Sequence, residues 1–311
     1  MSILDGLLAG IVAEPLEETR WLVLADWLEE FDDPRRAELL RLHRKLVATC
    51  CEPELYPDRK QWQAQIVELL LASVQPCVPQ TTLSLPGGME MTFSFIPPGV
   101  FRMGSKQRNA LPSEKPAHRV RLTKGFYLGV YPVTQARWAA VMGTNPSHFK
   151  GPNRPVDTVS RDDCQAFCEK LTMHLGGHGK VRLPSEAEWE YACRAGTTTE
   201  YHTGNGWATF KKTGWLQPAE TRPVGKLMGN AWGLHDFYGN VWEWCQDSYA
   251  PYPRGEVTDY VKIDKQSNHY VLRGGSVRYG FYDCRVTGRL QWSNGARDDA
   301  GCRVVFNPDE L

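Results

Sequence analysis

The sequence predicts an α+β protein in which a small all-α domain, residues 1–76, precedes a larger mixed domain, residues 77–311. Two patterns indicate this division. Apolar residues recur at helical spacing through the first 76 residues, whereas short alternating stretches begin soon after Cys77. The chain also has 28 glycines, 21 prolines and 11 tryptophans, a composition typical of a loop-rich fold with aromatic packing and little regular secondary structure.

Four helices are expected in the N-terminal domain. Apolar side chains at helical spacing predict one helix over Leu4–Ile11 and a second over Trp21–Leu28. Asp33 has the side chain of an N-cap and is followed by proline, which favours the first position of a third helix. A fourth helix is predicted over residues 61–73. We find no catalytic cluster here, so this domain is expected to dock or tether the larger one.

Short strands and well-capped helices are predicted for the larger domain. The strands are expected at residues 81–86, 91–96, 120–122 and 125–131, with a turn at 86–88. Thr134, Ser160 and Ser185 are the expected N-caps of three helices, and Ser185 with Glu188 forms a capping box.

Charge and cysteine content exclude several classes of function. Lys and Arg total 36 and Asp and Glu total 36, which removes the global electrostatic argument for nucleic-acid or anionic-membrane partners. A signal peptide and a long apolar run are both absent from the sequence, so we expect a cytoplasmic protein without membrane insertion. Nine cysteines, an odd number, favour reduced thiols. Cys50 and Cys51 are adjacent, and Cys164 and Cys168 are expected in the core rather than at a metal.

The words LVLADWLEE and DPRRAELLRLH resemble the short repeat-companion domain found at the N-terminus of many planctomycete proteins. The resemblance covers about residues 3–46. It implies a source lineage and carries no chemistry.

Five ordered blocks of the larger domain resemble the formylglycine-generating enzyme (sulfatase-modifying factor) family over about residues 83–307. They are KPAHRVRLTKGFYLGVYPVTQARWAAVMG, RPVDTVSRDDCQAFCEKL, VRLPSEAEWEYACRAG, NAWGLHDFYGNVWEWCQD and VLRGGS with GCRVV. The resemblance implies that family's C-type-lectin-like α+β fold.

A calcium site is expected in GLHDFYGNVWEW, at Asp236, Gly239, Val241 and Glu243. Two carboxylates and two backbone carbonyls are the hard oxygen ligands that Ca²⁺ takes. The resemblance implies the same positions as the family's second calcium site. Alternatively, Asp236 and Glu243 accept hydrogen bonds from backbone amides of the loop.

The segment from Arg273-Gly274-Gly275-Ser276 to Cys284 decides whether copper chemistry is expected. The resemblance places the second copper-binding cysteine of the family at Cys284 and the first at Tyr279. A protonated phenol cannot replace a Cu(I) thiolate, so copper and formylglycine-generating activity are not expected. Cys284 is expected to be a buried structural cysteine, with a reactive thiol as the alternative. The non-haem iron branch of the family is not expected either, because His43, His174 and His178 do not form its histidine set.

The same segment is rich in the residue types that dominate binding hot spots. The candidate ligand-binding residues are Arg278, Tyr279, Tyr282, Asp283, Arg289, Gln291, Asn294 and Arg297. Phe281 and Trp292 are expected to pack inward. The first hypothesis is therefore a non-catalytic module that binds a protein or peptide. The alternatives are a metal-dependent oxidoreductase modifying a peptide or small thiol through Cys284, and a retroelement-diversified variable binding protein or subunit of a larger assembly.

Overall fold

The computed structural model describes residues 2–215 and 219–308 of the chain. Met1, residues 216–218 and residues 309–311, which include the outer ends of both predicted domains, lie outside the described part. The predicted α+β class is confirmed, with helices first and short strands in several sheets after them. No helix in the described ranges is long and apolar enough to cross a membrane.

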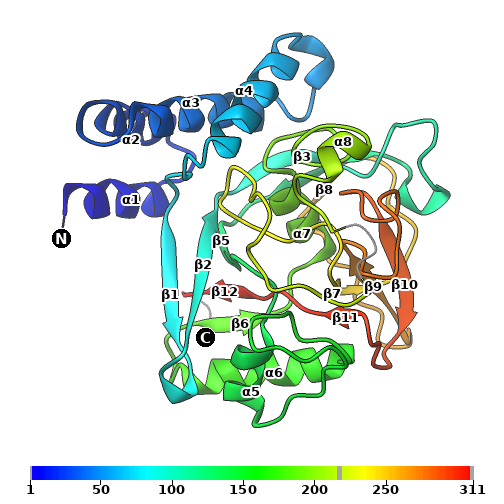
Figure 1. Ribbon diagram of the computed structural model, residues 1–311. Helices are drawn as coiled ribbons and strands as arrows, with labels where there is room; N and C mark the ends of the chain where they lie inside the picture. Colours follow the sequence, from blue (N-terminus) through cyan, green and yellow to red (C-terminus); the bar gives the residue numbers. More distant parts are fainter. Residues whose placement is uncertain (1, 216–218, 309–311) are drawn as a thin grey trace.

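The N-terminal part forms the four expected helices, which lie together on one side of the molecule (Figure 1). They are α1 (Ile3–Ala13), α2 (Glu18–Phe31), α3 (Pro34–Ala48) and α4 (Arg59–Leu71), with a 3₁₀ turn η1 (Pro53–Leu55) before the last. The Asp33 carboxylate accepts from the Arg35 backbone N–H at 3.0 Å, and Pro34 is the first helical residue, so the predicted cap is confirmed.

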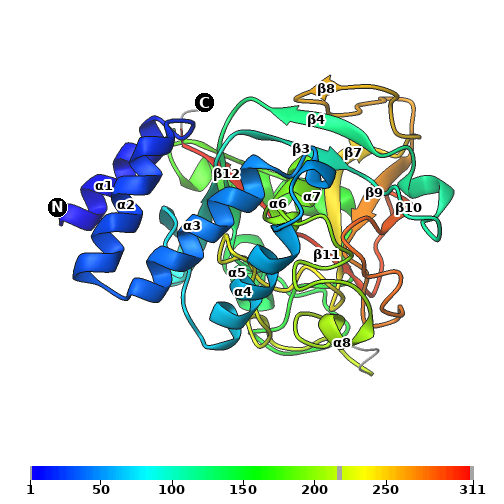
Figure 2. The same cartoon turned by 90° about the horizontal axis from the view of Figure 1, so that it is seen from above.

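Buried contacts join these helices to the rest of the chain. The Arg59 guanidinium donates to the Leu46 carbonyl at 2.8 Å and to the Gly196 carbonyl at 2.6 Å. One continuous apolar core includes Leu46 of α3 and Ala192 of the larger part. Figure 2 shows α3 and α4 lying across the mixed part of the fold. The domain boundary at residues 76 and 77 stays a prediction, since the packing across it is extensive.

Three sheets make up the larger part. The first contains β1 (Gln80–Ser84), β2 (Glu90–Ile96), β5 (Phe126–Gly129), β12 (Val305–Asn307) and β6 (Lys180–Arg182), in that order. The second orders β10 (Arg289–Ser293), β9 (His269–Arg273), β7 (Trp242–Ser248) and β11 (Ala300–Gly301). The third orders β3 (Gly99–Met103), β4 (His118–Leu122) and β8 (Val257–Thr258). The 3₁₀ turns η2 (Pro86–Gly88) and η3 (Pro112–Glu114) lie between strands.

The three expected caps begin helices α5 (Gln135–Met142), α6 (Arg161–His174) and α7 (Glu186–Arg194). The Ser185 hydroxyl accepts from the Glu188 backbone N–H and the Glu188 carboxylate accepts from the Ser185 N–H, so the predicted capping box is confirmed. A short helix α8 (Trp207–Phe210) follows. All nine residues of α7 are buried. This helix contacts β3, β7 and β9, so it positions the segment that follows β9.

Candidate functional site

The Arg273-Gly274-Gly275-Ser276 turn leads from β9 into the candidate segment, residues 277–298. Gly274 and Gly275 have φ of 95° and 77°, a region that disfavours residues with a Cβ. A Cβ at Gly275 would overlap the Sγ of Cys284, and one at Gly274 would lie 2.8 Å from the Phe237 carbonyl oxygen. Both glycines are therefore required by the close approach of Cys284 and Phe237 to the backbone.

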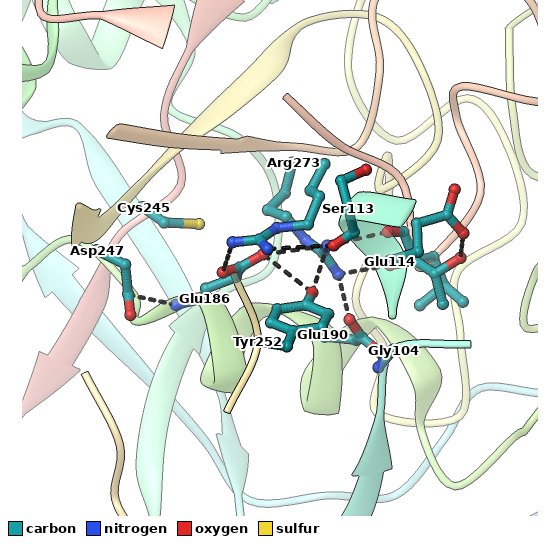
Figure 3. A network of polar contacts seen from close by, with 12 residues as sticks. Gly104, Ser113, Glu114, Glu186, Glu190, Cys245, Asp247, Tyr252 and Arg273 are labelled. Carbon is teal, nitrogen blue, oxygen red and sulfur yellow. Dashed lines mark hydrogen bonds and ion pairs between the residues drawn. The ribbon is translucent and has the colours of Figure 1, made fainter. Parts of the chain in front are cut away.

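The Arg273 side chain links this segment to helix α7. Its guanidinium, which is fully buried, forms ion pairs with Glu186 at 3.3 Å and with Glu190 at 2.5 Å (Figure 3). It also donates to the carbonyl oxygens of Val286 at 2.7 Å and Thr287 at 3.2 Å. One buried charge thus ties helix α7 to the far end of the loop that contains Cys284.

Ser276 and Asp299 close the segment at its base. The Ser276 hydroxyl donates to the Asp299 carboxylate at 2.6 Å, and both side chains are buried. Arg297 donates to the same carboxylate through Nε at 2.7 Å and through a terminal nitrogen at 3.1 Å. Because these bonds join the two ends of the segment, the residues between them are held as one closed loop.

Cys284 lies under this loop and has no exposed surface. Burial, with the Asp283 charge beside it, raises the pKa of its thiol well above the ordinary range. A protonated thiol is a poor nucleophile and a poor ligand for Cu(I). The predicted burial of Cys284 is confirmed.

Tyr279 stands at the position where the family resemblance places a copper cysteine. Its ring meets Trp242 edge-on, with 5.1 Å between ring centroids, and its hydroxyl accepts from Arg297 at 3.4 Å. The ring packs against the second apolar core. Tyr279 is therefore a half-buried supporting residue whose hydroxyl already has a donor.

Trp292 and Arg297 form the first aromatic patch of the segment, which we call the Trp292 patch. Trp292 is 38% exposed, so the expectation that it packs inward is wrong. It lies on β10 with its ring against solvent, and the Arg297 guanidinium stacks 4.1 Å from the ring centroid. The neighbouring arginine covers one face of the indole and leaves the other side available.

A second group, the Tyr282 patch, consists of Trp207, Phe281 and Tyr282, with the buried Phe210 ring packed beneath it. Tyr282 is 57% exposed and stacks on Phe281 at 4.0 Å between centroids. Phe281 is partly buried, as expected, and lies 5.5 Å from Trp207 of α8. Sequence reasoning missed Trp207, because 74 residues separate it from Phe281 and its glycine-rich surroundings predict only a loop.

The prediction that Arg289 belongs to the binding surface is wrong. The side chain is buried at the start of β10. Its guanidinium donates to Glu186 at 2.8 Å and stacks over the Tyr252 ring at 4.2 Å. A buried arginine with a buried carboxylate partner stabilises the interior and is not free for a ligand.

The other predicted binding residues are more accessible. Arg278 is exposed and pairs with Asp298, which is similarly exposed. Asp283 and Gln291 are exposed as well, whereas Asn294 is half-buried and donates to the Asp162 carboxylate at 2.5 Å. The exposed loop surface therefore combines aromatic rings with arginines whose charge is locally balanced.

The predicted calcium residues fit a cation only in part. The Asp236 carboxylate is buried, and while one oxygen accepts from the Gly225 N–H at 2.6 Å, the other has no partner among the described residues. Burial raises its pKa to about 6. Glu243, in contrast, is paired with Arg303 at 3.0 Å and accepts from the Trp189 indole at 2.7 Å. Gly239 and Val241 could contribute only backbone oxygens.

The histidines named for an iron site lie apart. His43 is buried and meets the Trp232 ring, and burial lowers its pKa to about 3. His174 is the last residue of helix α6, and His178 follows in the loop after it. Among the described residues, no group of three or more His, Cys, Asp or Glu side chains could hold a metal ion.

Known proteins similar to this chain include a protein named as a chaperone and several formylglycine-generating enzymes. It is 33% identical to the chaperone protein LppX of Paenibacillus barcinonensis, a match that covers 58% of this chain and 79% of that protein. It is 29% identical to the formylglycine-generating enzyme of Mus musculus, over 58% of this chain and 64% of the enzyme. The mouse enzyme is thus matched over less than two thirds of its length.

Two solved structures match the larger part of the fold. Treponema denticola variable protein 1 superimposes with a TM-score of 0.68 at 29% identity, covering 74% of this chain and 99% of that one. PvdO from Pseudomonas aeruginosa gives a TM-score of 0.63 at 25% identity, covering 74% and 98%. The expected C-type-lectin-like fold is confirmed by these neighbours. Residues 84–308 match the family described as the sulfatase-modifying factor enzyme 1-like domain, and the chain belongs to that family.

Proposed function

We propose that this protein is a non-catalytic binding module that recognises a protein or peptide through residues 277–298. The observation that carries the proposal is the contrast between Cys284 and its surroundings. The single thiol of the segment is buried and its pKa is raised, whereas Tyr282 in the loop and Trp292 on β10 are exposed to solvent. Large exposed aromatic side chains on a rigid support are typical of binding hot spots.

The charges of the segment indicate which ligands fit. Arg278 pairs with Asp298, and Arg297 pairs with the buried Asp299 at 2.7 Å. Because both guanidinium groups already have carboxylate partners, the segment offers little net charge to an anion. The ligand expected here is a polypeptide that inserts apolar or aromatic side chains, with the arginines stacking on aromatic rings.

The names of two similar proteins are compatible with binding. One relative is named a chaperone and one structural neighbour a variable protein. The formylglycine-generating enzymes among the relatives keep the oxidoreductase alternative open, with Cys284 as its candidate residue. A variable binding protein and a subunit of a larger assembly are special cases of the proposed role.

A calcium ion and a cytoplasmic location are further parts of the proposal. The unpartnered oxygen of Asp236 supports a cation at that carboxylate, completed by backbone oxygens of the same loop. Nine free thiols are compatible with a reducing compartment. Calcium would neutralise the buried carboxylate and stabilise the loop, and no step of the binding role depends on it.

Peptides selected from a random phage-displayed library on the wild-type protein would test the binding role. Binding of a selected peptide is then compared in Trp292→Ala, Tyr282→Ala and Tyr56→Ala, the last an exposed tyrosine on the helical part that serves as the control. We expect at least one loop variant to weaken binding about tenfold or more, the effect of roughly 1.4 kcal/mol, and the control to leave it unchanged. Selected peptides that bind all four proteins equally would contradict the proposal.

A further inference from the structure

The two adjacent cysteines at the junction between the helical part and β3 have no role in the proposed binding site. Cys50 and Cys51 lie in the turn after α3. Cys51 is half-buried, whereas the other eight cysteines are all buried. Only at Cys51 does the structure therefore combine a thiol, access to solvent and a second thiol beside it.

Basic groups surround Cys51. Arg102 of β3 donates to the Cys51 carbonyl oxygen at 2.5 Å and pairs with Glu54 at 2.7 Å. Arg119 of β4 is the cross-strand partner of Arg102, so the two guanidinium groups leave the β3–β4 ribbon on the same side. Arg119 in turn pairs with Glu256 at 3.5 Å, and Glu52 is an acidic sequence neighbour of Cys51. The two arginines act more strongly on Cys51 than Glu52 does, and so favour its thiolate form.

Cys50 completes the pair from the interior. Its Sγ lies 3.1 Å from the Val100 carbonyl oxygen and also beside the Cys51 thiol, so its single S–H serves one of the two acceptors at a time. The positive charges of Arg59 and Arg194 also act on the Cys50 thiol. A hydrogen bond from Cys50, helped by Arg119 and Arg102, lowers the pKa of Cys51 to about 7, while the same contact and burial raise that of Cys50.

We propose that Cys50 and Cys51 form a reactive dithiol site that is modified by peroxide and by soft electrophiles. The Cys51 thiolate attacks one oxygen of hydrogen peroxide, the O–O bond breaks, and Cys51 becomes a sulfenic acid while hydroxide leaves. Cys50 then attacks the Cys51 sulfur, the S–O bond breaks, and the hydroxide released takes the Cys50 proton as water. Two electrons pass from the two thiols to peroxide, and one disulfide remains. Because Cys50 contacts Val100, this oxidation alters the junction between the helical part and β3.

Alkylation of the native protein by limiting iodoacetamide, followed by peptide mapping, tests the first step. Cys51 is expected to react first and with a pH midpoint near 7, so that at pH 7 it reacts about tenfold faster than an ordinary thiol of pKa about 8.5. Arg102→Gln and Arg119→Gln should each move the midpoint upward, whereas Cys77→Ser, at a buried thiol, should leave it unchanged. Labelling of any other cysteine first, or a midpoint near 8.5, would overturn the proposal.

Hydrogen peroxide tests the second step. The wild-type protein is expected to lose two hydrogen atoms in intact mass and to give no dimedone adduct, because Cys50 consumes the sulfenic acid. Cys50→Ser is expected to keep that acid and to give a dimedone adduct on Cys51. Near-ultraviolet circular dichroism establishes that the variant is folded. Equal dimedone trapping in both folded proteins, or no reaction in either, would overturn the role assigned to Cys50.

Discussion

Arg273 donates to Glu190 at 2.5 Å, although both side chains are fully buried. Glu190 also accepts from Arg194 at 2.7 Å and from the Gly104 backbone N–H at 2.8 Å. Every charge in this group has a partner of opposite sign, which offsets the large cost of removing the charges from water. The group joins α7, β9 and the carbonyl oxygens of the Cys284 loop, so the stability of the loop depends on it.

Substitution of Glu190 by glutamine is expected to destabilise the protein by about 3–5 kcal/mol, the typical cost of breaking a buried ion pair. The Arg273 and Arg194 donors would face an amide that cannot accept at both positions. Urea denaturation followed by circular dichroism measures the change. Arg278→Ala, which breaks the exposed pair with Asp298, serves as the control and should cost less than about 1 kcal/mol. Equal losses in the two variants would contradict the structural role of the buried group.

Asp236→Asn is expected to make stability less dependent on pH. Burial raises the pKa of the folded-state carboxyl to about 6 from an ordinary value of 3.8, so wild type loses stability as the pH rises from about 4 to 6. The asparagine variant can keep the bond from Gly225 without a buried charge. In EDTA it should be more stable than wild type at pH 8, by at most about 3 kcal/mol, and equal to it at pH 4.

If calcium binds Asp236, adding it at pH 8 should make wild type more stable than Asp236→Asn. Wild type should then gain thermal stability with increasing Ca²⁺, and Asp236→Asn should gain less. A pH dependence that is unchanged by the substitution would contradict the raised pKa. A calcium response that is equal in both proteins would contradict the proposed position of the cation.

Gly275→Ala is expected to cost more than the left-handed backbone alone, which accounts for about 1–2 kcal/mol. The added Cβ overlaps the Sγ of Cys284 and lies 3.0 Å from its Cα. In a Cys284→Ala background the sulfur is gone, so the cost of Gly275→Ala should fall toward the backbone value. A double-mutant cycle measured by chemical denaturation gives the coupling, and strict additivity would contradict the packing of this thiol under the turn.

Binding of a selected peptide should depend weakly on salt. Arg278 and Arg297 are already paired with carboxylates, so few charges remain for long-range attraction to a ligand. Between 0.05 and 0.5 M NaCl, we expect the dissociation constant from isothermal titration calorimetry to change by less than about threefold. A steep loss of affinity with salt would indicate an anionic ligand held by free arginines.

Local chemistry made the helix caps predictable from the sequence. Ser185 and Glu188, or Asp33 and Pro34, interact within three residues, so the pattern alone contains the contact. The family resemblance supplied the topology, which residue periodicity could not. Cys284 was correctly expected to be buried from its local sequence context, CRVTGR.

Long-range partners account for what sequence reasoning missed. Arg289 looks like a surface residue until Glu186, 103 positions away, is placed 2.8 Å from it. Trp292 looks like a core residue, but Arg297 stacks on its exposed ring. Trp207 joins Phe281 only in the folded chain. In each case, a contact between two side chains sets how exposed the residue is. The two side chains are far apart in sequence or lie in an irregular loop, so a periodic sequence pattern cannot predict that they meet.

A copper(I) titration against a competing chelator tests the central claim most directly, because Cys284 is buried and Tyr279 occupies the position where the family has its first copper cysteine, so a two-thiolate site cannot form. Wild type and Cys284→Ala are titrated under anaerobic conditions with the other cysteines present in both. The account predicts no copper retained at Cys284, so that the two titrations coincide. One tightly bound equivalent in wild type that is lost in Cys284→Ala would contradict it and would favour an oxidoreductase.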